Sequence, residues 1–196
     1  RPSPLRGLVQ RSKEFEVDGI DLLPFTLPAA APIVGIGWGK NAAASSSALE
    51  SRHGTIVRLS DSSRRASGVG EVSPLPGLHR ESPDKARAQL LLVRDRLAER
   101  GDGGGDGAAS SLRFDARRIL ELEGYLEASV RRIARECEIP ALVPSVSSGL
   151  EGALLHMAAE RTGRSVVEAL RATHGGRWGA ALPLNGLRTR GEDDAG

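Results

Sequence analysis

Apolar and polar residues alternate in three short stretches near the start of the chain, and such alternation is typical of β-strands. The first stretch spans residues 15–25 and is interrupted by Asp18-Gly19, which favours one strand with a bulge, with a tight hairpin as the alternative. The second stretch spans residues 55–59, and the third spans residues 67–72. Together these stretches predict a three-stranded antiparallel meander.

Farther along the chain, apolar residues recur every three or four positions, which predicts amphipathic helices. The first helix has Ser82 as its N-cap and Pro83 as its first residue, and Gly101 ends it. A second helix is predicted over residues 114–136. Its expected buried stripe consists of Ile119, Leu122, Leu126, Val130, Ile133 and Cys137.

Two more helices and one strand are predicted in the last third of the chain. A third helix over residues 145–162 is expected to leave an apolar face exposed, which predicts poor solubility. Ser165 and Glu168 form a capping box for a short fourth helix, and residues 182–187 predict a short apolar strand without a partner. The predicted fold class is therefore α+β, a meander followed by a bundle of three to four helices.

The segments between these elements set the expected domain boundaries. Residues 26–52 predict a long loop, and residues 101–111 predict a low-complexity linker. Residues 1–12 are expected to be a disordered lead-in, and residues 13–172 to form one folded domain. Residues 173–196 are expected to begin a second unit and to end in a disordered tail.

Composition excludes several classes of protein. Acidic and basic residues are interspersed and the formal net charge is +2, which gives no electrostatic footprint for nucleic acid. Cys137 is the only cysteine, so an internal disulfide is excluded and a buried, inert thiol is expected. No apolar run approaches about 18 residues, so no membrane span is expected. The chain begins with Arg1 and its only methionine is Met157, which indicates a processed or excised piece.

Residues 73–79, here called the prolyl loop, follow the third predicted strand. Pro74 and Pro76 each fix φ and hold the preceding residue extended, so this loop is expected to be stiff. His79 ends the loop and is a candidate to face a substrate, because loops often carry function. Glu71 precedes the loop and is expected to form an ion pair or to accept a backbone hydrogen bond.

No complete catalytic constellation is recognised in the sequence. The glycines and lysine of residues 35–40 lack the spacing of a phosphate-binding loop. No two of the 4 histidines are close enough in sequence to indicate a metal pair. Serine, histidine and aspartate also do not occur in the order of a catalytic triad with its supporting glycine motifs. The sequence therefore predicts a cover for an active site more readily than the active site itself.

Four segments carry a resemblance to a known family. Residues 54–59 (GTIVRL) are similar to the family's second strand, and residues 68–82 contain its pattern G-x-G-E-x-S-P-L-P-G. Residues 144–155 resemble the helix that leads to its barrel, and residues 182–187 (LPLNGL) resemble the first barrel strand. In this order the segments resemble the N-terminal capping domain of the enolase superfamily and, more narrowly, o-succinylbenzoate synthase.

The resemblance implies a reaction, and it assigns the cover and the catalytic groups to two different domains. Such a lyase removes a proton next to a carboxylate, with Mg²⁺ stabilising the enediolate, and expels water in menaquinone or phylloquinone biosynthesis. Residues 13–172 would be the capping domain, and residues 173–196 would begin a truncated TIM-type barrel. The catalytic lysines and metal carboxylates would lie in the missing barrel domain. This chain alone is therefore expected to be inactive and to bind no Mg²⁺.

The resemblance also implies a site, a location and alternatives. The residues expected to cap a small-molecule carboxylate substrate are Phe25, Ser73, Leu75, Pro76, Gly77, Leu78 and His79. The arginine- and alanine-rich composition resembles that of a green algal protein. In plants and algae the enzyme is part of a fused, plastid-targeted pathway protein, so the resemblance implies the chloroplast, and a soluble intracellular location is expected otherwise. The alternatives are the capping domain of a racemase or cycloisomerase, and a stand-alone α+β interaction module.

Overall fold

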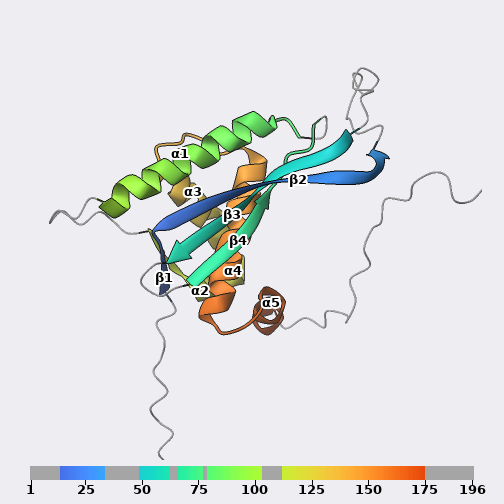
Figure 1. Ribbon diagram of the computed structural model, residues 1–196. Coiled ribbons are helices and arrows are strands. Elements are labelled where there is room, and N and C mark those ends of the chain that lie inside the picture. The colour runs from blue at the N-terminus through green and yellow to red at the C-terminus, as the bar shows by residue number, and fades with distance from the viewer. Residues whose placement is uncertain (1–13, 34–48, 62–65, 77–78, 103–111, 175–196) are drawn as a thin grey trace, which may run out of the picture.

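The computed structural model describes residues 14–33, 49–61, 66–76, 79–102 and 112–174 (Figure 1). The predicted lead-in, the strand predicted at residues 182–187 and most of the predicted linker lie outside the described residues. Gly77 and Leu78 also lie outside them.

A three-stranded antiparallel sheet forms the front layer of the molecule in Figure 1. Its strands are β2 (Gly19–Ile33), β3 (Leu49–Asp61) and β4 (Ala66–Val72), in the order β2-β3-β4. The predicted meander and the α+β fold class are confirmed. Val57 and Leu59 of β3 are fully buried, since every second residue of this strand faces the helices.

Strands β2 and β3 extend well beyond the predicted segments. The loop prediction is therefore wrong at both ends of the segment 26–52, because residues 26–33 belong to β2 and residues 49–52 to β3, with Thr26 paired to His53 and Pro28 to Ser51. Proline is tolerated in β2 because this strand lies at the edge of the sheet, where a missing N–H breaks no ladder bond. The prolines that suggested a loop are thus compatible with an edge strand.

The predicted first strand is divided between two sheets at Asp18-Gly19. Strand β1 (Glu14–Val17) pairs with β5 (Leu112–Asp115), whereas β2 pairs with β3, so neither the bulge nor the hairpin forms. A Cβ at Gly19 would lie 2.4 Å from Ser60 Oγ, so a larger residue here would require the Ser60 side chain to rotate away. The rings of Phe15 and Phe114 stack at a centroid distance of 5.8 Å and join the small sheet to the core.

Five helices complete the described fold. They are α1 (Pro83–Asp102), α2 (Ala116–Glu121), α3 (Tyr125–Glu136), α4 (Pro144–Arg161) and α5 (Val166–His174). Two predicted helix starts are confirmed. The Ser82 hydroxyl accepts the Lys85 N–H at 3.2 Å, and Ser165 and Glu168 make the reciprocal bonds of a capping box.

The single helix predicted over residues 114–136 is wrong. Leu122 adopts φ 59° and Gly124 φ 76°, and these left-handed residues separate α2 from α3. The start of α2 is set by Asp115, whose carboxylate accepts the N–H groups of Arg117 and Arg118. Leu122 was expected in the buried stripe but is 42% exposed. Cys137, at the end of α3, is buried as predicted.

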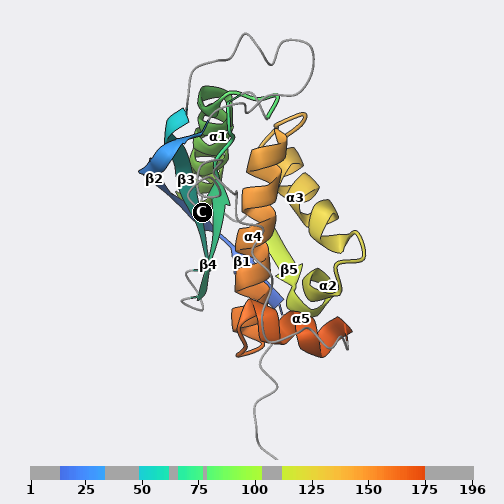
Figure 2. The same ribbon diagram turned by 90° about the vertical axis from the view of Figure 1, so that its right-hand side faces the viewer.

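Helix α4 lies between the sheet and the pair α2 and α3 (Figure 2). It approaches β4 backbone to backbone, since a Cβ at Gly70 would lie 1.8 Å from the Gly149 carbonyl oxygen. Its apolar residues are buried on both sides, so the prediction of an exposed apolar face on this helix is wrong. That prediction assumed one buried face, whereas a central helix is apolar nearly all round.

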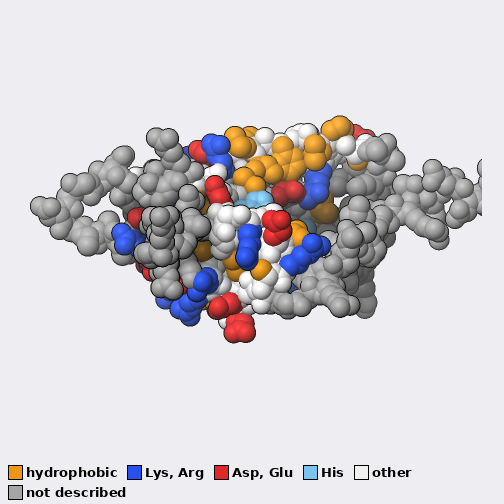
Figure 3. All heavy atoms as spheres, turned by 90° about the horizontal axis from the view of Figure 1, so that it is seen from below, with side chains coloured by type: hydrophobic (Ala, Val, Ile, Leu, Met, Phe, Trp, Pro, Cys, Tyr) orange, Lys and Arg blue, Asp and Glu red, His pale blue; other side chains and the backbone are white. Residues whose placement is uncertain are grey.

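Side chains of α4 also cover the free edge of β4. The Ser67 N–H donates to Glu160 Oε2 at 3.0 Å, and the Val69 N–H donates to His156 Nδ1 at 3.4 Å. These bonds satisfy backbone donors that an edge strand leaves open. On the described face seen from below, acidic and basic side chains are interspersed and no patch of one sign forms (Figure 3).

Candidate functional site

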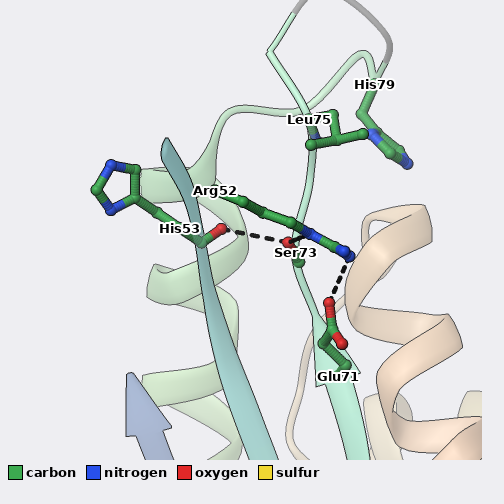
Figure 4. A network of polar contacts seen from close by, with 6 residues as sticks. All are labelled: Arg52, His53, Glu71, Ser73, Leu75 and His79. Carbon is green, nitrogen blue, oxygen red and sulfur yellow. Dashed lines mark hydrogen bonds and ion pairs between the residues drawn. The ribbon is translucent and has the colours of Figure 1, made fainter. Parts of the chain in front are cut away.

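A hollow of about 450 Å³ lies where the prolyl loop leaves β4 and meets the start of α4. It is lined by residues from three segments far apart in sequence, and Figure 4 labels those that come from β3, β4 and the prolyl loop. The lining residues are Arg52, Glu71, Ser73, Leu75, His79, Pro144, Ser145 and Ser148. The hollow is open to solvent on one side, so a ligand could enter it without local unfolding.

Arg52 connects β3 to the end of β4 (Figure 4). Its Nε donates to Ser73 Oγ at 2.7 Å, and its Nη2 donates to Glu71 Oε1 at 2.5 Å. The Ser73 hydroxyl in turn donates to the His53 carbonyl oxygen at 3.3 Å. The ion pair predicted for Glu71 is therefore confirmed, and its partner is Arg52.

His79 closes the prolyl loop on itself. The Leu75 N–H donates to His79 Nδ1 at 2.8 Å, and the His79 N–H donates to the Leu75 carbonyl oxygen at 3.0 Å. Because Nδ1 accepts a hydrogen bond, the neutral ring carries its hydrogen on Nε2. Figure 4 shows this ring turned toward the start of α4. The loop is thus held by its prolines and by a pair of bonds across four residues.

Glu81 fixes the start of α4 through Ser145, one of the residues that line the hollow. It is only 6% exposed, and its Oε1 accepts the Ser145 N–H at 2.9 Å. Burial raises the pKa of Glu81, but hydrogen bonding from Ser145 and from the Glu81 backbone, together with the nearby His79, outweighs burial, so this pKa lies below its usual value. The Ser145 hydroxyl lies near this carboxylate but makes no hydrogen bond of regular geometry. A buried carboxylate thus takes the place of an N-cap side chain.

The structure brings together three of the residues predicted to cap a substrate. Ser73, Leu75 and His79 line the hollow. Pro76 is exposed at the turn of the loop. Phe25 is not among the residues that line the hollow, but its ring lies across Gly54 beside Ser73: a Cβ at Gly54 would lie 2.4 Å from the ring and 2.9 Å from Ser73 Cβ. Contact between these residues and a substrate stays a prediction.

Sequence reasoning missed Arg52 and the start of α4 as parts of this site. Arg52 was placed in a loop, because β3 was predicted to begin only at Thr55. In the register of β3 and β4, Thr55 pairs with Val72, so Arg52 lies just beyond the pairing, level with the prolyl loop. A longer predicted β3 would have brought Arg52 to the loop. Ser148 gave no comparable signal.

Other chemistry is limited in the part of the chain that the structure describes. No three histidine, cysteine, aspartate or glutamate side chains gather there to hold a metal ion, so these residues do not fit a Mg²⁺ site. None of the described helices is long and apolar enough to cross a membrane. A second hollow of about 420 Å³ lies beside α3 and contains none of the residues predicted to cap a substrate.

Part of the chain matches a known protein family. Residues 40–116 match the family model described as MenC, N-terminal domain, which is o-succinylbenzoate synthase. The predicted resemblance is therefore confirmed for this segment, which contains β3, β4, the prolyl loop and α1. No curated protein sequence matches the chain.

Solved structures similar to this chain include three enzymes. A mandelate racemase/muconate lactonizing enzyme from Roseiflexus sp. has 19% identity and a TM-score of 0.44, over 76% of this chain and 30% of its own. A second such enzyme, described as putative, from Sorangium cellulosum has 18% identity and a TM-score of 0.41, over 78% and 33%. MenC from Desulfotalea psychrophila LSv54 has 20% identity and a TM-score of 0.40, over 71% and 35%. The chain thus spans about a third of each.

Proposed function

We propose that this chain is the capping domain of an o-succinylbenzoate synthase-like lyase in menaquinone or phylloquinone biosynthesis. The observation that carries the proposal is the position of the hollow. It is bounded by Arg52 and the prolyl loop, and both lie inside the segment that matches the MenC N-terminal domain. A stiff loop beside an open hollow suits a cover that shapes a substrate pocket and excludes water.

The residues of this chain would act by position and not by chemistry. Pro74 and Pro76 restrict the loop, the His79–Leu75 bonds close it, and Arg52 ties it to β3. Such a cover keeps its shape when it meets the barrel, so little entropy is lost on closure. Leu75 would offer an apolar contact to a substrate held beneath it.

The reactive groups would come from a barrel domain. When bound there, Mg²⁺ would stabilise the negative charge that develops when the proton next to the carboxylate is removed. The described residues do not fit a metal site, so no step of the reaction is assigned to them. The chain alone is accordingly expected to show no turnover.

The test is to supply the barrel polypeptide of the parent protein to this chain and to follow formation of o-succinylbenzoate with Mg²⁺ present. Turnover is expected only when both polypeptides are present. A barrel whose catalytic lysines are replaced by alanine is the control and should be inactive. Turnover by the chain alone, or equal turnover by the barrel alone, would contradict the proposal.

We also propose that the parent protein acts in the chloroplast, as the composition and the resemblance to plant and algal pathway proteins indicate. A fluorescent fusion of the full-length parent protein should co-localise with chlorophyll. A second fusion, from which the N-terminal segment of the parent protein has been deleted, should stay outside the plastid. Signal from both fusions in another compartment would contradict this location.

A further inference from the structure

Residues from three segments form a row across the sheet at the point where β4 ends. Phe25 of β2 is paired with Gly54 of β3. Thr55 and Val72 form the last pair of β3 and β4. The next residues are Gly54 on β3 and Ser73 after β4, and these two lie opposite each other. The row therefore connects the edge strand β2 to the prolyl loop, across β3.

The ring of Phe25 occupies the space that Gly54 leaves open on this face of the sheet. A Cβ at Gly54 would lie 2.4 Å from Phe25 Cζ, 2.7 Å from Phe25 Cε1 and 2.9 Å from Ser73 Cβ. The ring and the Ser73 side chain thus border the same gap above the glycine. An aromatic side chain that covers a glycine on the neighbouring strand stabilises a sheet by packing. A larger residue at position 54 would push the ring away from Ser73.

Two hydrogen bonds also hold Ser73, and both come from β3. Arg52 Nε donates to Ser73 Oγ at 2.7 Å, and the Ser73 hydroxyl donates to the His53 carbonyl oxygen at 3.3 Å. Because Ser73 precedes Pro74, its backbone is also restricted. The loop that follows is stiff, so its position relative to the sheet is decided at Ser73, where it leaves β4.

The strands that hold Ser73 are themselves joined beyond the end of β4. There β2 and β3 continue as a two-stranded ribbon, residues 25–28 and 51–54, here called the β2–β3 ribbon. The His53 ring is hydrogen-bonded to the Thr26 hydroxyl at Nδ1 and to the Ser51 hydroxyl at Nε2, each at 2.9 Å. Figure 4 shows this ring turned away from Ser73, so these bonds support the ribbon from its other face.

We propose that Phe25 is a positioning residue for the prolyl loop. Its ring, seated over Gly54, keeps Ser73 against the β2–β3 ribbon, so the ribbon and the loop move as one unit. This role differs from the substrate contact predicted from the sequence, because the ring acts through Ser73. The inference does not rest on the proposed function, since every contact that carries it lies within this chain.

The test is ¹⁵N relaxation of the labelled chain, in which Phe25→Leu is compared with the original. The backbone amides of Leu75 and His79 should lose order together, with order parameters that fall from about 0.85 toward about 0.6. The Arg52 Nε resonance should shift in the same variant, because Ser73 is no longer held in place to accept its hydrogen bond. A ring that only adds stability would move neither signal.

Leu23→Ala is the matched control for the loss of the ring. Leu23 lies two residues before Phe25 on the same face of β2, but it is 51% exposed and is paired with Ile56 instead of Gly54. This variant should leave the order of the loop amides unchanged. The amide of Val57, which is buried at the centre of the sheet, should keep its order in both variants and so report an intact fold.

A second substitution tests the contact between the ring and the glycine. Gly54→Ala places a methyl group against Phe25 Cζ and Cε1, and leucine has no atoms at these positions. Gly54→Ala should therefore lower the midpoint of urea unfolding more in the original chain than in Phe25→Leu.

Three results would each overturn the inference. They are unchanged order of the loop amides in Phe25→Leu, the same loss of order in Leu23→Ala, and an equal effect of Gly54→Ala with and without the ring. None of them bears on the proposed function, which is decided separately by turnover in the presence of the barrel.

Discussion

Two neighbouring regions of α4 and β4 are held together by different interactions. One is the contact between the helix and the strand, and the other is the hollow at the end of β4. In the contact, Gly68 and Gly70 allow the backbone of the strand to touch the backbone of the helix. In the hollow, a few residues later, half-exposed polar side chains hold a proline-restricted loop. The first region depends on the absence of side chains, and the second depends on their hydrogen bonds.

This difference separates stability from function within one structural unit. Backbone contact in the core cannot be rearranged without a large loss of free energy, because packed interiors leave no room for an added methyl group. The polar groups of the hollow exchange one hydrogen bond for another at little cost. Substitutions in the helix–strand contact should therefore change the free energy of unfolding, whereas substitutions in the hollow should mainly change local hydrogen exchange.

The largest expected effect is on the core contact. Gly70→Ala places a Cβ 1.8 Å from the Gly149 carbonyl oxygen, so helix and strand must separate. We expect a loss of about 3 kcal/mol in the free energy of unfolding, measured by urea denaturation. The displaced oxygen is backbone and cannot move aside as a flexible side chain would.

Gly152→Ala is the matched control for that substitution. Gly152 lies on α4 and faces β4 in the same contact, but a Cβ at Gly152 would be 3.5 Å from Gly70 Cα, which is an ordinary van der Waals distance. Alanine in a helix interior is favoured over glycine, so this variant should gain up to about 1 kcal/mol. Equal destabilisation by both variants would show that backbone contact does not decide the stability of this region.

A smaller effect is expected at Glu81, which holds the start of α4 through the Ser145 N–H. Glu81→Gln should cost about 1 kcal/mol at neutral pH, because the start of α4 loses a buried carboxylate acceptor. The pKa of Glu81 is lowered from 4.5 in the folded chain, so its contribution is present above the unfolded pKa. It is lost as the pH falls through the lowered folded value.

The measurement is the free energy of unfolding of both chains from neutral to acid pH. The two curves should differ at neutral pH and converge below the ordinary value of 4.5. A constant difference at all pH values would indicate that the substitution acts through packing and not through the charge of Glu81.

A still smaller effect, of opposite sign, is expected at the break between α2 and α3. Leu122 has φ 59° and is 42% exposed, so its side chain contributes little packing while its backbone is strained. Leu122→Gly should raise the free energy of unfolding by about 0.5 kcal/mol, as glycine accepts this conformation. Leu126→Gly, in the buried stripe of α3, is the contrasting control and should destabilise.

Sequence reasoning succeeded where the signal was local and failed where partners were distant. The caps at Ser82 and Ser165 were predicted, because each depends on residues within one helical turn. The pairing of β1 with β5 was missed, since it joins Glu14 to Asp115 and neither strand reveals its partner. The hollow was only half predicted for the same reason: the prolyl loop is one segment, whereas Arg52 comes from another.

The smallest expected effect on stability is at the hollow. Arg52→Met removes a half-exposed ion pair with Glu71 and a bond to Ser73, so the free energy of unfolding should change by only about 0.3 kcal/mol. Hydrogen exchange should nevertheless rise at the Leu75 amide, because the loop loses its tie to β3 while its bond to His79 remains. The amide of Val57, in the centre of the sheet, should keep its protection. If both amides exchanged faster, Arg52 would belong to the cooperative core, and the separation between the two regions would not hold.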